Sequence, residues 1–180
     1  MSSNPRKQLE NWLKTIDVKG RVIDVGGVSI NINPKRVKSW EAKDYKVLDR
    51  VKSDYIYDIN YPFHLEEKFD TAFCLEVMEY VWNPVQALKN IHDLLEENGL
   101  LYISFHFMFP HHHPRETDCL RYTINGIKKL MKETGFEIEQ EVPRTAKYPD
   151  ELIKRCFTES KLVFNRGQIG YLIKGRRINK

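Results

Sequence analysis

The stretch RVIDVGGVSI, residues 21–30, decides the fold. Its first part, residues 22–25, is a short apolar run rich in β-branched side chains, which is typical of a strand buried on both faces of a parallel sheet. The run ends at Gly26 and Gly27, whose missing Cβ atoms allow a sharp turn and the close approach of a ligand to the main chain. The stretch therefore predicts a buried strand that ends in a glycine turn beside a ligand site.

A second apolar run, residues 45–48, ends at Asp49, about twenty positions after the glycine turn. A carboxylate at this place accepts two hydrogen bonds from a ribose diol in nucleotide-binding sheets. The glycines continue as GGVSININP, without the third spaced glycine and the long helix of a dinucleotide fingerprint. This favours a cofactor with a ribose and no diphosphate, of which S-adenosylmethionine (SAM) is the commonest. The alternative is a tight turn after a strand, with no ligand.

The composition, 41% hydrophobic and 30% charged, is that of a folded globular protein and excludes a disordered chain. The length of 180 residues predicts one domain, 1–180, with an N-terminal helix in 1–20 and an α/β core in 21–180. No apolar run approaches the ~20 residues that span a bilayer, and the N-terminus lacks an apolar signal core. We therefore expect a cytoplasmic protein without a membrane segment.

The three cysteines, Cys74, Cys119 and Cys156, are odd in number and widely spaced, which favours neither a disulfide framework nor a zinc knuckle. The net charge is +4, and part of it lies in the tail KGRRINK, residues 174–180. Such a tail is typical of a solvated end, although it also permits contact with RNA. Nucleic acid is thus an alternative partner, and a small molecule is the favoured one.

Strands and helices are expected to alternate along the chain, which predicts an α/β fold with a doubly wound, mostly parallel, seven-stranded sheet and one antiparallel edge strand. The expected strands are residues 22–25, 45–48, 54–58, 69–77, 100–107, 136–142 and 170–177. The expected helices are residues 4–16, 34–43, 84–95, 123–134 and 149–164, the third of them closed by Asn98-Gly99. Ligands bind such sheets outside the carboxyl ends of the strands, where the strand order reverses.

Several pieces of the sequence occur in the order found in the class I SAM-dependent methyltransferases. They are VIDVGG, VLD ending at Asp49, YDINYPF, KFDTAFCLEVMEYVWNP and LLEENGLLYIS. The chain thus resembles the small Rossmann-like members of this family, of the methyltransferase type 11 kind, over roughly residues 21–177. The resemblance implies SAM as the cofactor and methyl transfer as the activity.

The resemblance also implies cofactor contacts for eight residues at or just past strand ends: Asp24, Gly26, Gly27, Asp49, Asp58, Ile59, Leu75 and Glu76. In this assignment the first three surround the methionine part of SAM and Asp49 binds the ribose. Asp58 with Ile59 contacts adenine, and Leu75 with Glu76 lines the floor near the methyl group. Val28 and Ile30 replace two spaced glycines of the family. This departure keeps open a non-catalytic domain of the same fold that binds a nucleoside-like ligand or a partner.

The loop after the fifth strand, HFMFPHHHPRETDCLRYT, contains titratable side chains where an acceptor would enter. Because histidine titrates near neutrality, we expect the general base among the catalytic candidates His106, His111, His113 and Asp118. We expect Arg121 and Tyr122 to contact substrate. The alternative is that Asp118 and Arg121, three positions apart, form a local ion pair.

Adjacent histidines of an extended segment point to opposite faces, so we expect no metal site in this loop. The loop resembles that of a subgroup acting on sugars or other small polar metabolites. The expected function is therefore methyl transfer to a small polar or sugar-like acceptor, with an RNA or protein methyltransferase as an alternative.

Overall fold

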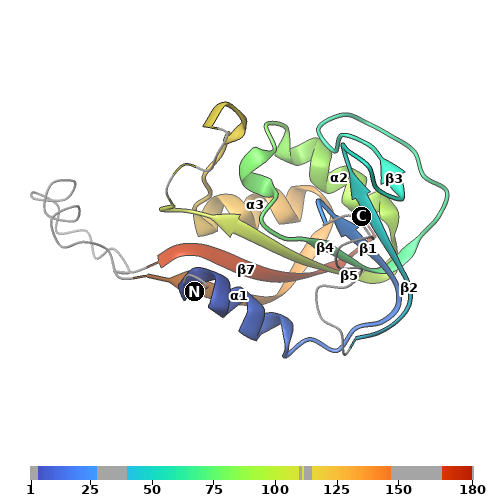
Figure 1. Cartoon of the computed structure of the whole chain (residues 1–180), viewed down its shortest axis with the longest axis horizontal. Coiled ribbons are helices and arrows are strands. Elements are labelled where there is room, and N and C mark those ends of the chain that lie inside the picture. The colour runs from blue at the N-terminus through green and yellow to red at the C-terminus, as the bar shows by residue number, and fades with distance from the viewer. Residues whose placement is uncertain (1–3, 28–39, 110, 112–114, 147–167, 180) are drawn as a thin grey trace, which may run out of the picture.

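A seven-stranded sheet forms the centre of the computed structural model, which describes residues 4–27, 40–109, 111, 115–146 and 168–179 (Figure 1). The strand order is β3-β2-β1-β4-β5-β7-β6. The strands are β1 (Lys19–Val25), β2 (Glu41–Asp49), β3 (Tyr55–Ile56), β4 (Phe69–Cys74), β5 (Leu95–His106), β6 (Phe136–Thr145) and β7 (Gln168–Arg177). The predicted doubly wound, mostly parallel sheet is confirmed.

The strand order reverses at β1, because β1 pairs in parallel with β2 on one side and with β4 on the other. The carboxyl ends of these three strands therefore meet at one edge of the sheet, where open α/β sheets bind their ligands. The antiparallel strand is β7, which pairs with both β5 and β6. It lies one position in from the edge, and β6 is the edge strand.

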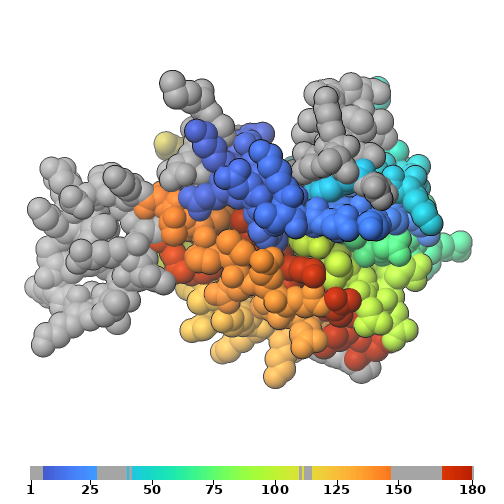
Figure 2. Space-filling model, turned by 90° about the horizontal axis from the view of Figure 1, so that it is seen from below, coloured from blue at the N-terminus to red at the C-terminus, as the bar shows by residue number. Residues whose placement is uncertain are grey.

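Helices cover the two faces of the sheet unequally, as Figure 1 shows. One core cluster joins the apolar residues of α2 (Pro84–Leu94) and α3 (Ile124–Glu133) to side chains such as Ile23 and Val25. The other face is covered by α1 (Asn4–Leu13), whose Trp12 and Leu13 pack with Val22. In the space-filling view of that side, the N-terminal residues in blue lie against β6 in orange (Figure 2). Two apolar faces thus hold every central strand in place.

Two short polar caps fix where the helices of the first face begin. Asn83 accepts a hydrogen bond from the Gln86 amide, with Pro84 at the first position of α2, where a missing N–H costs nothing. Thr123 accepts one from the Gly126 amide at the start of α3. Both helices thus begin where the sequence predicts them, at residues 84 and 123–124.

The end of α2 differs from the prediction, because the helix stops at Leu94 and β5 begins at Leu95. Asn98 does take a positive φ of 62°, but it bends the first part of β5 and does not close the helix. Pairing of Phe69 with Leu95 extends the strand by the five residues before Leu100 and overrides the local helical pattern. The predicted helices at 34–43 and 149–164 fall largely or wholly outside the described residues, although β2 already begins at Glu41.

The basic tail is part of the sheet rather than a separate arm. Lys174 Nζ lies 2.6 Å from Glu139 Oε2, and Arg176 also pairs with Glu139. Arg177 donates a hydrogen bond to the Leu95 carbonyl. Within the described part of the chain, no helix combines the length and apolar character needed to cross a membrane.

Candidate functional site

The glycine turn follows β1 directly and depends on the absence of a side chain. Gly26 has a φ of 70°, and a Cβ there would lie 2.3 Å from Val77 Cγ2. The Gly26 amide donates to the Leu48 carbonyl at 2.8 Å, which ties the turn to the end of β2. Only glycine allows β1, β2 and the segment after β4 to approach so closely.

A cavity of about 230 Å³ opens beside this turn, at the carboxyl ends of β1, β2 and β4. Three carboxylates and one guanidinium contribute to its wall, and the rest is apolar, amide, phenol or glycine. The lining residues are Val25, Gly26, Leu48, Asp49, Arg50, Tyr57, Asp58, Ile59, Asn60, Glu76, Val77, Tyr80 and Val81. Five of the eight residues expected at a cofactor, Gly26, Asp49, Asp58, Ile59 and Glu76, are thus gathered around one cavity.

The two aspartates of the wall are held by their own loops. Asp49 Oδ1 accepts a hydrogen bond from the Val51 amide at 3.1 Å. Asp58 Oδ1 accepts from the backbone and side-chain nitrogens of Asn60 at 3.0 and 2.8 Å. Among the residues that the structure describes, none donates to Oδ2 of Asp49 or to Oδ2 of Asp58, so each of these oxygens can accept from a ligand hydroxyl. These donor and acceptor positions fit a nucleoside with a ribose diol, as SAM has.

The remaining three expected cofactor residues do not line the cavity. Leu75 is 2% exposed and packs in the core cluster on the α1 face. Asp24 is buried and accepts a hydrogen bond from the Tyr45 hydroxyl at 2.7 Å. The Gly27 amide lies 3.4 Å from the Asp24 carbonyl. Asp24 therefore supports the turn from beneath, because its side chain lies on the sheet face opposite to that of Val25.

Glu76 is the residue that joins the cavity to the interior. It follows β4 and has a φ of 60°, a conformation that costs a non-glycine residue about 1–3 kcal/mol and that clusters at functional sites. The Glu76 amide donates a hydrogen bond to Ser104 Oγ at 2.8 Å. Ser104 Oγ in turn donates to Glu76 Oε1 at 2.9 Å. Backbone and side chain of Glu76 are thus both anchored to β5.

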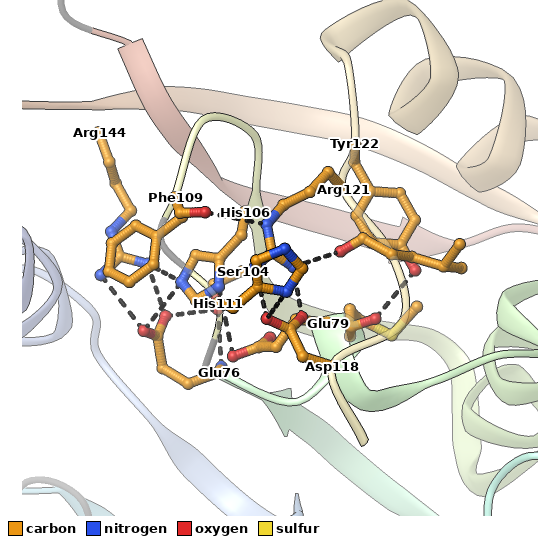
Figure 3. Close-up of polar contacts among 12 residues, drawn as sticks. Glu76, Glu79, Ser104, His106, Phe109, His111, Asp118, Arg121, Tyr122 and Arg144 are labelled. Carbon is orange, nitrogen blue, oxygen red and sulfur yellow. Dashed lines mark hydrogen bonds and ion pairs between the residues drawn. The ribbon is translucent and has the colours of Figure 1, made fainter. Parts of the chain in front are cut away.

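Three buried side chains, Glu79, His106 and Arg144, lie behind Glu76 and form a polar cluster with it (Figure 3). His106 Nε2 is 3.2 Å from Glu76 Oε2, and His106 Nδ1 is 3.3 Å from Glu79 Oε1. Arg144 Nη1 is 2.6 Å from Glu76 Oε1. The Phe109 ring stacks on the imidazole, with centroids 4.3 Å apart and planes within 7°. Glu76, at 34% exposure, is the most open member.

The pKa values of the two carboxyls in this cluster are shifted in opposite directions. Burial by itself raises the pKa of Glu76, but the hydrogen bond with His106 and the charge of Arg144 outweigh burial and lower its pKa to about 2. Burial also raises the pKa of Glu79, and there the charge of His106 offsets it only in part. Glu76 is therefore the anion of the cluster, and Glu79 is the carboxyl that retains a proton more readily.

His106 is one of the four candidates for the general base, and its side chain is 1% exposed and lies behind Glu76. His111 is 72% exposed, with its Nδ1 3.5 Å from Asp118 Oδ2. His113 lies outside the described residues. The structure thus separates two histidines that the sequence grouped together: one is enclosed by carboxylates and the other reaches solvent.

Arg121 and Asp118 form the local ion pair that was the alternative to substrate binding. The Arg121 guanidinium donates to both oxygens of Asp118, at 2.5 and 2.6 Å, and the Asp118 side chain is completely buried. Tyr122, the other expected substrate contact, is also buried, and its hydroxyl donates to the Met78 carbonyl at 2.9 Å. These residues fix the loop onto η1 (Met78–Tyr80) in the structure described.

Two contributors to the site were not found from the sequence. Arg144 lies near the end of an edge strand, and nothing in the segment EVPRT marks it as buried. Asn60 accepts from the amides of Trp82 and Asn83, both at 3.0 Å, and so joins the loops on either side of the cavity. The sequence signal that could have identified Asn60 is its position directly after the expected cofactor residues Asp58 and Ile59. Among the described residues, no group of three or more His, Cys, Asp or Glu side chains is arranged to hold a metal ion.

Comparison with known proteins identifies a family for this chain. Residues 4–141 match the model of a methyltransferase domain family. An S-adenosylmethionine dependent methyltransferase from Mesorhizobium loti has the same fold, with a TM-score of 0.63 at 16% identity over 96% of this chain and 98% of that one.

Two curated proteins match short segments. A ubiquinone biosynthesis O-methyltransferase of Glaesserella parasuis is 50% identical over 38 residues, which are 21% of this chain and 16% of that protein. A tRNA U34 carboxymethyltransferase of Sulfurimonas denitrificans is 42% identical over 52 residues, 27% of this chain and 18% of that protein. The matched segments thus span less than a fifth of either relative. Since the family model covers most of the sequence and the fold agrees with it, the chain belongs to the methyltransferase domain family.

Proposed function

We propose that this protein transfers a methyl group from SAM to a small polar or sugar-like acceptor. The proposal is carried by the cavity of about 230 Å³ at the switch point of the sheet, whose wall combines Asp49, Asp58 and the glycine turn. Bound SAM supplies an electrophilic methyl group on a positively charged sulfur. The chain's own part is to bind this cofactor, to orient the acceptor and to accept a proton from it.

Five residues of the cavity wall have roles in this proposal. Asp49 accepts hydrogen bonds from the ribose hydroxyls, and Asp58 with Ile59 contacts the adenine. Gly26 admits the methionine part, and the anionic Glu76 attracts positive charge to its end of the cavity. His111, oriented by Asp118 at 3.5 Å, is the proposed proton acceptor on the acceptor side. His113 of the same loop remains a proposal of the sequence alone.

RNA is a second candidate acceptor, favoured by the tRNA-modifying relative. The basic tail, residues 174–180, permits contact with RNA. The pairing of Lys174 and Arg176 with Glu139 makes this tail less available for RNA. Because these two cations share one carboxylate, their net charge is reduced, and they would release fewer counterions from a phosphate backbone. A small acceptor is therefore the proposal we favour.

The test is calorimetric titration of the purified protein with SAM and with S-adenosylhomocysteine, using NAD as the control ligand. Saturable binding of both sulfur ligands and none of NAD is the expected result. Methyl transfer is then assayed with radiolabelled SAM against a panel of sugars and hydroxylated metabolites, with total tRNA as a separate arm. Absence of binding by both sulfur ligands would overturn the proposal and favour a non-catalytic domain of this fold. Label transfer to tRNA alone would replace the small acceptor by RNA.

A further inference from the structure

Three residues form a row across the last three strands of the sheet. His106 of β5 pairs with Gly170 of β7, and Gly170 pairs with Arg144 of β6. Directly opposed residues of antiparallel strands point to the same face of a sheet. The middle position of the row has no side chain, and a Cβ there would lie 2.4 Å from the Phe105 carbonyl oxygen. Glycine at this position therefore lets β7 lie close against the backbone of β5.

The Arg144 side chain reaches from β6 across β7 and β5 to Glu76 in the cavity wall. Its side chain is 1% exposed, although β6 is an edge strand. Nη1 lies 2.6 Å from Glu76 Oε1 and 3.4 Å from His106 Nε2, and Nη2 lies 3.4 Å from Glu76 Oε2. The guanidinium thus spans both oxygens of the one carboxylate that belongs to the cluster and to the cavity (Figure 3).

We propose that Arg144 is a positioning residue, which fixes the Glu76 carboxylate as an anion in the cavity wall so that the cavity favours a cationic ligand over a neutral one of the same shape. The inference deepens the proposed function, because the sulfonium of SAM is such a cation and the thioether of S-adenosylhomocysteine is its neutral counterpart. Arg144 itself does not line the cavity, so it acts through Glu76.

His106 and Arg144 are the two groups whose contacts keep Glu76 in its charged form. A carboxyl buried to this degree prefers its neutral form unless a cation compensates, and removing one partner of a buried pair exposes the full desolvation cost. The charge of Arg144 is among the causes that keep the pKa of Glu76 low. The titratable or charged groups that face Glu76 from the packed elements and across the cavity are His106, Arg144, Glu79, Tyr80, Asp49, Asp58 and Arg50. Arg144 is the permanent cation in direct contact with it.

The test compares the two ligands as a function of pH in the native protein and in Arg144→Gln, which keeps hydrogen-bond donors without the charge. In the native protein, the ratio of the dissociation constants for S-adenosylhomocysteine and SAM should stay constant between about pH 5 and about pH 8. In Arg144→Gln, we expect this ratio to fall by up to about tenfold towards pH 5, since burial then raises the pKa of Glu76 without the charge of Arg144 to offset it. The amino and carboxyl groups of the two ligands are identical, so their titration cancels in the ratio.

Arg176→Gln is the matched control, because Arg176 is a partly exposed arginine of β7 that pairs with Glu139 outside the cavity. It should behave as the native protein, and Arg144→Lys, which keeps a cation, should retain most of the pH-independence. An unchanged ratio in folded Arg144→Gln would overturn the inference.

Carbon-13 NMR of the Glu76 carboxyl provides a measurement that needs no ligand and does not depend on the Arg144 variants. In the native protein the signal, assigned with Glu76→Gln, should titrate well below the ordinary glutamate range of about pH 4. Titration at an ordinary value would refute the role of Arg144 even if SAM binds. A low titration point in a protein that binds neither sulfur ligand would instead refute the proposed function and leave the role of Arg144 intact.

Discussion

His106 Nδ1 lies 3.3 Å from Glu79 Oε1, and both side chains are only 1% exposed. The cluster around them holds two carboxyls, one guanidinium and one imidazole. The cluster has no net charge when Glu79 and His106 are both neutral, and also when both are charged. The two states contain the same protons and differ only in whether Glu79 or His106 holds one of them. A buried cluster of zero net charge avoids the desolvation cost of an isolated ion. The position of that proton determines how Glu79 affects stability.

Glu79→Gln should flatten the pH dependence of stability. Because burial raises the folded pKa of Glu79 above its unfolded value, its contribution is present at low pH and is lost as the pH rises through the raised folded pKa. The glutamine variant mimics the protonated form, so it should match the native protein near pH 4 and exceed it by about 1 kcal/mol near pH 8. Urea unfolding at several pH values measures this. A variant that loses equal stability at every pH would indicate an ionised Glu79, and Glu96→Gln is an exposed control.

Asp49→Asn should weaken SAM binding about 10- to 100-fold, because a hydrogen bond to a charged acceptor contributes about 1.5–3 kcal/mol. The substitution keeps an oxygen for the Val51 amide, so the turn after β2 should persist. Asp44→Asn is the control, since Asp44 pairs with Lys46 on the surface at 3.5 Å. Calorimetry measures both variants. Native affinity in Asp49→Asn would show that the ribose lies elsewhere.

Arg121→Met should lower the free energy of unfolding by about 2–4 kcal/mol, because it leaves the buried Asp118 carboxylate without its cation. The expected change is larger than for Lys46→Met, which breaks a surface pair worth at most about 1 kcal/mol. Thermal and urea unfolding compare the two. Equal losses would mean that the Asp118 and Arg121 pair does not hold the loop, and a role for Arg121 in substrate binding would then be reconsidered.

Diethylpyrocarbonate should modify His111 at least about tenfold faster than His106 in the native protein, since carbethoxylation of a buried imidazole requires local opening. The exposed fractions of the two side chains are 72% and 1%. Peptide mapping by mass spectrometry follows each site over time, and the rates should converge in urea. Rapid modification of His106 in the native state would place that imidazole in contact with solvent.

The sequence by itself determined the order of strands and helices, because local periodicity and glycine or cap residues act within a few positions. The apolar run before Gly26, the run before Asp49 and the cap at Thr123 all follow from such short-range rules, and all three elements are in the structure. The gathering of Gly26, Asp49 and Glu76 at one edge followed from the parallel topology. The end of α2 could not be predicted, since pairing of Leu95 with Phe69 decided it.

Tertiary structure decided which side chains meet. Leu75 and Glu76 both follow β4, yet Leu75 packs on the α1 face while Glu76, with a φ of 60°, lines the cavity, and only the packed sheet determines where each side chain goes. Arg144 lies 68 positions after Glu76 in the sequence, and the two side chains meet only in the folded sheet. His106 is likewise enclosed by Glu76 and Glu79, which follow another strand. Burial and charge pairing are properties of the assembled sheet, because both depend on partners supplied by distant strands.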